Sequence, residues 1–167
     1  MMNSDKQGRP RAFRSIEQAA AVSLLQTTDA FRRRLTRAIE PFGITLQQFN
    51  VLRILRGAGL DGLATLTVAN RMVERTPGVT RLLDRLEAEG LVERVRDTED
   101  RRRVVARITP QGRSLLERVD DTFEDAEDGA FGDLNEAEVE QLNRYLGRVR
   151  VHLEAIEQNP ERLDDAT

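Results

Sequence analysis

The hydrophobic repeat of this chain changes its period twice, from about 3.6 residues to two and back again. Up to residue 90, apolar side chains recur every three or four positions, as they do in helices packed on one face. Residues 91–96 and 103–109 instead alternate apolar and polar side chains, and a charged turn joins them, which predicts a β-hairpin. The helical period returns at Pro110. The pattern therefore predicts a mainly α fold with a small β-hairpin wing.

Capping and helix-breaking residues divide the helical stretches. Thr45 with Gln48 three residues later is the pattern of a capping box. Thr76 followed by Pro77 is typical of a helix start, and Gly90 is placed to close the same helix. The predicted helices cover 13–39, 46–56, 67–73, 76–89, a stretch from 110 and a stretch from about 135.

Composition excludes several classes of protein. The 167 residues include no Cys and a single His, His152. A disulfide scaffold, a thiolate metal site and a multi-histidine metal site are therefore excluded, and a Ser-His-Asp triad is disfavoured. No apolar run approaches the roughly 18 residues of a membrane span, and the polar stretch 1–14 lacks the apolar segment of a secretory signal. We expect a cytoplasmic protein that contacts no membrane and needs no cofactor or metal.

The charges are unevenly distributed. Residues 1–59 carry a net charge of +6, residues 60–110 carry +1 and residues 111–167 carry −10. The acidic balance thus belongs to the last third and does not argue against nucleic-acid binding by the rest. All basic residues except Lys6 are arginine, which suits phosphates and guanine edges, although GC-rich codons explain the same bias.

A short helix, a tight connection, a second helix and a hairpin follow one another in the order of a winged helix-turn-helix. A helix enters the major groove of duplex DNA with its first residues at the base edges. Because the apolar side chains of 76–89 must face the core, we expect the outward ones to contact DNA. They are Thr76, Gly78, Thr80, Arg81 and Arg85.

Three consecutive arginines, Arg101, Arg102 and Arg103, occupy the predicted hairpin tip. Such a wing follows the DNA backbone and places an arginine in a narrow minor groove. The alternative is a solvated turn that Asp97, Glu99 and Asp100 neutralise locally. The position directly after a helix-turn-helix pattern favours the DNA contact.

Three motifs lie within residues 68–112: VTRLLDRLEAEGLV at 79–92, D-x-x-D-R-R at 97–102 and ITPQG at 108–112. With two helices before them and two long helices after, they closely resemble the MarR family of bacterial transcriptional regulators. The resemblance extends from about 13 to 156.

The resemblance implies a homodimer that binds pseudo-palindromic promoter sites on double-stranded DNA, usually as a repressor. It places the recognition-helix arginine at Arg81 and the wing-tip arginine at Arg101 or Arg102. Asp84 and Asp100 match acidic positions that orient such arginines by ion pairing, although each also fits an ordinary exposed carboxylate. In many members, a small phenolic or other aromatic ligand releases the DNA.

A long apolar seam in the sixth predicted helix favours a dimer independently of the resemblance. Its residues recur every three or four positions, which is typical of a helix packed on a long partner helix, and the first helix offers such a partner. Purely intramolecular packing remains the alternative. The predicted interface comprises Phe13, Ile16, Val139, Leu142, Leu146, Val149, Leu153 and Ile156.

The expected organisation has four parts. Residues 1–12 form a flexible arm and 158–167 an acidic tail. A winged helix-turn-helix at 41–110 is flanked by a helical dimerisation region at 13–40 and 111–157. The basic run 32–37 pairs either with acidic residues of the last two helices or with phosphates.

A ligand pocket is expected between the second helix, the end of the first and the fifth. Its candidates are Phe42, Phe49, Arg53, Leu116 and Phe123. Arg53 would neutralise a carboxylate or phenolate, while the apolar members also fit a plain core.

Three hypotheses about function follow: a ligand-responsive regulator, a DNA-binding regulator controlled by its abundance or a protein partner, and an enzyme. The enzyme is disfavoured because the acidic residues of 117–140 read as a solvated helix face.

Overall fold

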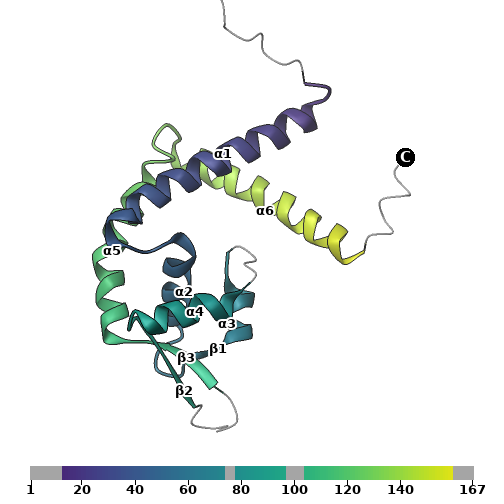
Figure 1. Ribbon diagram of the computed structural model, residues 1–167. Helices are drawn as coiled ribbons and strands as arrows, with labels where there is room; N and C mark the ends of the chain where they lie inside the picture. The colour runs from purple at the N-terminus through teal and green to yellow at the C-terminus, as the bar shows by residue number, and fades with distance from the viewer. Residues whose placement is uncertain (1–12, 74–77, 97–103, 160–167) are drawn as a thin grey trace, which may run out of the picture. The chain divides into compact units, whose positions relative to one another are not determined.

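A computed structural model describes residues 13–73, 78–96 and 104–159 (Figure 1). The fold is mainly helical with a small antiparallel sheet, as predicted. Its elements are α1 (Ile16–Ile39), η1 (Glu40–Phe42), α2 (Leu46–Gly57), β1 (Leu63–Ala64), α3 (Thr65–Arg71), α4 (Val79–Ala88), β2 (Val92–Arg96), β3 (Val104–Ile108), α5 (Pro110–Asp128) and α6 (Glu136–Gln158). The chain divides into two compact units, Met1–Ala126 and Glu127–Thr167. The predicted arm and most of the predicted tail lie outside the described residues.

Local capping explains where α2 begins. The Thr45 hydroxyl accepts a hydrogen bond from the Gln48 amide at 3.2 Å, and the Gln48 side-chain oxygen accepts one from the Thr45 amide at 2.9 Å. This reciprocal pair is the predicted capping box, which the structure confirms. Gln48 is buried, and its side-chain amide also donates to Glu89 at 3.2 Å. The same contact thus joins the start of α2 to the end of α4.

Several predicted boundaries were wrong by a few residues. The first helix begins at Ile16 instead of residue 13, because Ser15 accepts a hydrogen bond from Gln18 and caps it. The third helix occupies Thr65–Arg71 instead of 67–73. The fourth helix, α4, begins at Val79 with Gly78 as its N-cap, instead of at the predicted 76–77. Thr76 and Pro77 themselves lie outside the described residues.

The sheet contains a strand that the sequence did not predict. β1 is only two residues long, too short to show alternation, and it pairs antiparallel with β3 through Leu63 opposite Ala106. β3 also pairs with β2 from Val92 opposite Ile108 to Arg96 opposite Val104, which confirms the hairpin. The strand order is β1-β3-β2.

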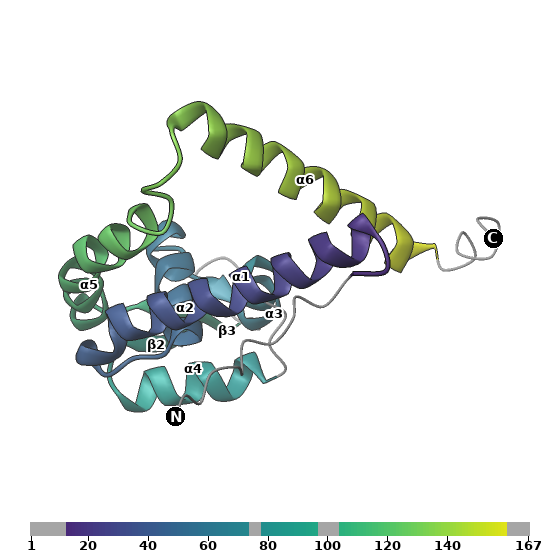
Figure 2. The same cartoon turned by 90° about the horizontal axis from the view of Figure 1, so that it is seen from above.

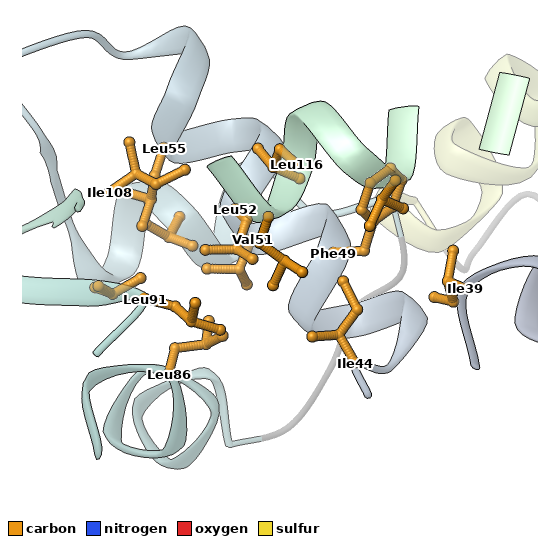
Figure 3. Close-up of a cluster of buried hydrophobic side chains, with 14 of the residues drawn as sticks. Ile39, Ile44, Phe49, Val51, Leu52, Leu55, Leu86, Leu91, Ile108 and Leu116 are labelled. Atoms are coloured by element: carbon orange, nitrogen blue, oxygen red, sulfur yellow. The ribbon is translucent and has the colours of Figure 1, made fainter. Parts of the chain in front are cut away.

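The core of the first unit is built around α2. Val51 and Leu52 are fully buried, with Leu86 of α4 on one side and Leu116 of α5 on the other (Figure 3). At Gly112, α5 lies close against the segment before β2, because a Cβ there would lie 2.3 Å from the Leu91 carbonyl oxygen. This contact fixes the start of α5 against the base of the hairpin.

Candidate nucleic-acid interface

Helix α4 has one buried face and one solvent-exposed face. Val79, Leu83 and Leu86 are buried in the core, as the apolar spacing predicted. The helix runs along the outside of its unit (Figure 2). Its exposed side chains within the first two turns are Thr80, Arg81, Asp84 and Arg85. Thr80, Arg81 and Arg85 therefore reach solvent from one rigid element, and a polyanion can approach them.

Gly78 stands directly before α4 and has a left-handed backbone conformation, with φ of +92°. A Cβ at this position would meet no atom of the described residues within 4 Å, and Gly78 is exposed. Glycine adopts this conformation without strain and leaves room for close backbone approach. Because Gly78 has no side chain, nothing at this position covers the positive end of the α4 dipole.

Arg94 of β2 joins the hairpin to α4 through two acidic side chains. Its Nη2 lies 2.6 Å from Oδ1 of Asp84, and its Nη1 lies 2.7 Å from Oε2 of Glu87. The backbone N–H of Arg94 donates to Oε1 of Glu87 at 3.1 Å, and Nη2 donates to the Thr80 carbonyl oxygen at 3.3 Å. One guanidinium group thus bridges two turns of the helix.

The electrostatics of this bridge favour the charged arginine. The hydrogen bond that Arg94 donates to Asp84 raises the pKa of Arg94 above its usual value, burial lowers it, and the charge of Glu87 raises it further. The guanidinium fork makes separate hydrogen bonds to two carboxylates, a geometry that the single ammonium of lysine does not reproduce. The bridge therefore joins the hairpin to two acidic side chains of α4.

Sequence reasoning missed Arg94. Asp84 was expected to orient an arginine of the wing or helix, and the structure places it against this one. The available signal was a strand arginine close in sequence to two acids of the preceding helix, but that pattern does not reveal which groups meet. The candidates Thr76, Asp100, Arg101, Arg102 and Arg103 lie outside the described residues.

The predicted ligand-pocket residues pack closely together. The rings of Phe49 and Phe123 lie 4.4 Å apart between centroids and are tilted by 46°. The Arg53 guanidinium carbon stands 5.6 Å from the first centroid and 5.8 Å from the second. Leu116 is fully buried, and Phe42 is half-buried at the edge of the core. The two rings therefore contact each other between α2 and α5, beneath an exposed arginine.

The apolar seam of α6 is exposed at three of its positions and half-buried at the other three. None of its side chains is classed as buried, and Leu146, Val149 and Leu153 are 39%, 47% and 53% exposed. Val139, Leu142 and Ile156 are half-buried. The candidates of the first helix are also exposed, and they are Phe13 and Ile16.

At two positions of the basic run of α1, the structure shows partners other than acidic residues of the last two helices. Arg33 pairs with Asp29 of its own helix. Arg34 donates from Nε to the Ala126 carbonyl oxygen at 2.7 Å, so its partner in α5 is backbone and not an acidic side chain.

The residues that the structure describes hold no group of three or more His, Asp or Glu side chains that could bind a metal ion. None of the helices among them is both long and apolar enough to cross a membrane.

Comparison with known proteins agrees with this geometry. The model of the MarR family matches residues 44–104. The HTH-type transcriptional regulator FarR of Neisseria gonorrhoeae is 30% identical over 107 residues, which cover 64% of this chain and 72% of FarR. A crystal structure of a MarR transcription factor from Planctomyces limnophilus is 34% identical, with a TM-score of 0.62, over 81% of this chain and 98% of that one.

A complex with DNA is also among the similar structures. The MepR–DNA complex of S. aureus is 28% identical, with a TM-score of 0.71, over 79% of this chain and 96% of MepR.

Proposed function

This chain belongs to the MarR family of transcriptional regulators, and from that premise we propose that it is a homodimeric repressor. In this proposal the dimer acts in the cytoplasm and binds a pseudo-palindromic operator. A small aromatic or phenolic ligand then releases it from the DNA. The family consists of regulators and not enzymes, so no catalytic role is proposed.

The observation that carries the proposal is the exposed polar face of α4. Arg81 and Arg85 stand one helical turn apart on that face, with Thr80 beside them. A bidentate arginine contact to guanine is the commonest specific contact in the major groove. Arg94 holds the hairpin against the same helix, so that helix and wing would approach DNA as one body.

The exposed seam of α6 supports the dimer. Leu146 and Leu153 expose a large part of their apolar surface to water. A second copy of the chain packed on this face would remove that surface from water, which is favourable. A single recognition helix also contacts too few bases to specify one site, and a dimer supplies two such helices. Two recognition helices about 34 Å apart read successive turns of the major groove.

Ligand control is supported by relatives and by Arg53. The DNA binding of BpsR from Bordetella bronchiseptica, 26% identical to this chain, is regulated by 6-hydroxynicotinic acid. Arg53 lies above two aromatic rings and offers a cation to a carboxylate or phenolate. The alternative is a regulator without a small-molecule effector, controlled by abundance or a protein partner. The direct contact between Phe49 and Phe123 favours that alternative.

The experiment has two stages. Selection from a random duplex library would define the bound site, and fluorescence anisotropy would then measure affinity across a salt series. We expect nanomolar, salt-sensitive binding to a site with two symmetry-related halves. A panel of phenolic carboxylates is then added. Release by one compound supports ligand control, release by none favours the alternative, and failure to enrich any sequence contradicts operator binding.

A further inference from the structure

An ion pair joins α2 to α5 inside the first unit, one helical turn from Arg53 and Phe123. Nη1 of Arg56 donates to Oδ2 of Asp120, and Nη2 donates to Oδ1 at 3.3 Å, so the guanidinium fork meets both carboxylate oxygens. Both side chains are partly buried. Among the residues that the structure describes, neither side chain has another hydrogen bond or ion pair. Each is therefore committed to the other.

This ion pair contributes geometry more than stability. Partly exposed pairs add little to the free energy of unfolding, because water competes for both charges. A two-point contact between arginine and carboxylate is nevertheless specific in geometry, since both hydrogen bonds must be in line at once. The nearby contact between Phe49 and Phe123 depends mainly on buried apolar area, which a small shift changes little. The ion pair therefore opposes sliding of α5 along α2 more than the ring contact does.

The two helices that the pair joins lead to different parts of the molecule. Helix α2 holds the end of α4, because the buried side chain of Gln48 donates to Glu89 at 3.2 Å. Helix α5 carries the chain to the second unit, since the boundary after Ala126 falls in its last turn. The Arg56–Asp120 pair thus lies between the element that holds α4 and the helix that continues toward α6.

We propose that Arg56 and Asp120 are positioning residues that set the direction of α5 relative to α4. In a dimer, this direction determines the separation of the two α4 helices, and hence the spacing of half-sites that the dimer accepts. This role requires the proposed homodimer. One added base pair moves a half-site by about 3.4 Å and turns it by about a tenth of a helical turn. A dimer whose α5 direction is fixed therefore distinguishes operators that differ by one base pair in spacing.

Spin labelling tests this role on DNA-free protein. The chain has no cysteine, so a single cysteine carries the only label. Ala88 is exposed on α4, and Ala88→Cys places one label on each α4 of a dimer. Double electron–electron resonance then measures the distance between the two labels. We expect a narrow distance distribution in this background, and a broader or shifted one after Arg56→Gln or Asp120→Asn.

Two further variants separate the pair from charge alone. Arg118→Gln removes the same charge as Arg56→Gln from an exposed position of α5, and it should leave the distance distribution unchanged. Arg56→Asp combined with Asp120→Arg rebuilds an ion pair with the charges exchanged. We expect this double variant to narrow the distribution again, which the loss of an unrelated packing contact would not allow.

Operator binding supplies a second readout. Anisotropy compares the selected operator with duplexes whose half-sites lie one base pair closer or one base pair farther apart. We expect wild type to prefer its own spacing at least about tenfold, the scale of one mismatched base pair. Arg56→Gln should reduce this preference about threefold, the effect of losing one partly exposed ion pair, with base preferences inside each half-site unchanged.

The possible failures point to different claims. Label distances and spacing preference that are the same in Arg56→Gln as in Arg118→Gln would overturn the positioning role and leave operator binding intact. Equal weakening on all three spacings, with an unchanged distance distribution, would make the pair a stabilising contact only and also overturn it. A missing dipolar signal in the labelled wild-type background would contradict the homodimer and the positioning role together. Because the resonance measurement needs no DNA, failure to find an operator would contradict the proposed function alone.

Discussion

Replacement of Arg94 by alanine removes the bridge between the hairpin and α4. The two ion pairs, at 2.6 and 2.7 Å, join an arginine side chain that is 25% exposed to carboxylates that are 53% and 39% exposed. Exposed pairs contribute about 0.2–1 kcal/mol each. The loss also leaves Asp84 and Glu87 as like charges three residues apart, which costs a few tenths of a kcal/mol. We therefore expect a decrease of about 1–2 kcal/mol in the free energy of unfolding.

Urea denaturation followed by circular dichroism measures this decrease. Arg118→Ala is the matched control, because it removes the same charge from an exposed position of α5. Arg94→Lys keeps the charge but loses the planar fork, so its stability should lie between those of wild type and Arg94→Ala. Double-mutant cycles with Asp84→Asn and Glu87→Gln would apportion the energy between the two pairs.

Measurements of DNA binding distinguish two roles of Arg94: positioning the hairpin and contacting DNA directly. If Arg94 positions the hairpin, Arg94→Ala weakens operator binding up to about tenfold while the slope of log K against log salt stays unchanged. If it contacts phosphate, the slope falls by about one and Arg94→Lys restores binding. Unfolding of Arg94→Ala at the same urea concentration as Arg118→Ala would refute the structural bridge.

Three further changes test other parts of the structure. Gly112→Ala should destabilise the protein by about 2 kcal/mol or more, because the new Cβ would lie 2.3 Å from the Leu91 carbonyl oxygen. Gly57→Ala is the control, because a Cβ there meets no described atom within 4 Å, and it should leave stability nearly unchanged. Thermal unfolding measures both. Leu146→Asp should convert the dimer to monomer at micromolar concentration in analytical ultracentrifugation, and a variant that stays dimeric would contradict the α6 interface. Arg102→Ala should weaken operator binding with little change in sequence preference and lower the salt slope by about one, and an unchanged slope would place this arginine off the DNA.

The sequence predicted those features that depend on short-range patterns. The capping box of Thr45 and Gln48 and the buried face of α4 both follow from residues within a few positions of one another. β1 escaped prediction because two residues carry no alternation, and its partner Ala106 is distant in the sequence. Arg94 escaped because its role depends on how β2 packs on α4, which a local pattern does not contain.

The candidate ligand pocket shows a second limit of prediction from sequence. An aromatic residue at helical spacing indicates burial, but it does not distinguish a ring that lines a cavity from one that fills it. The sequence predicted Phe49 and Phe123 as candidates for one ligand pocket, and the structure shows their rings in contact with each other beneath Arg53.

In the proposed function, the exposed face of α4 reads the operator. The most direct measurement compares wild type and Arg81→Ala by anisotropy on the selected site, on single base-pair variants of it, and on an unrelated duplex. We expect Arg81→Ala to lose about 1–3 kcal/mol on the selected site and its preference at one base pair in each half-site. It should bind the unrelated duplex almost as well as wild type does. Equal affinity of the two proteins for the selected site, with the same base preferences, would contradict the account.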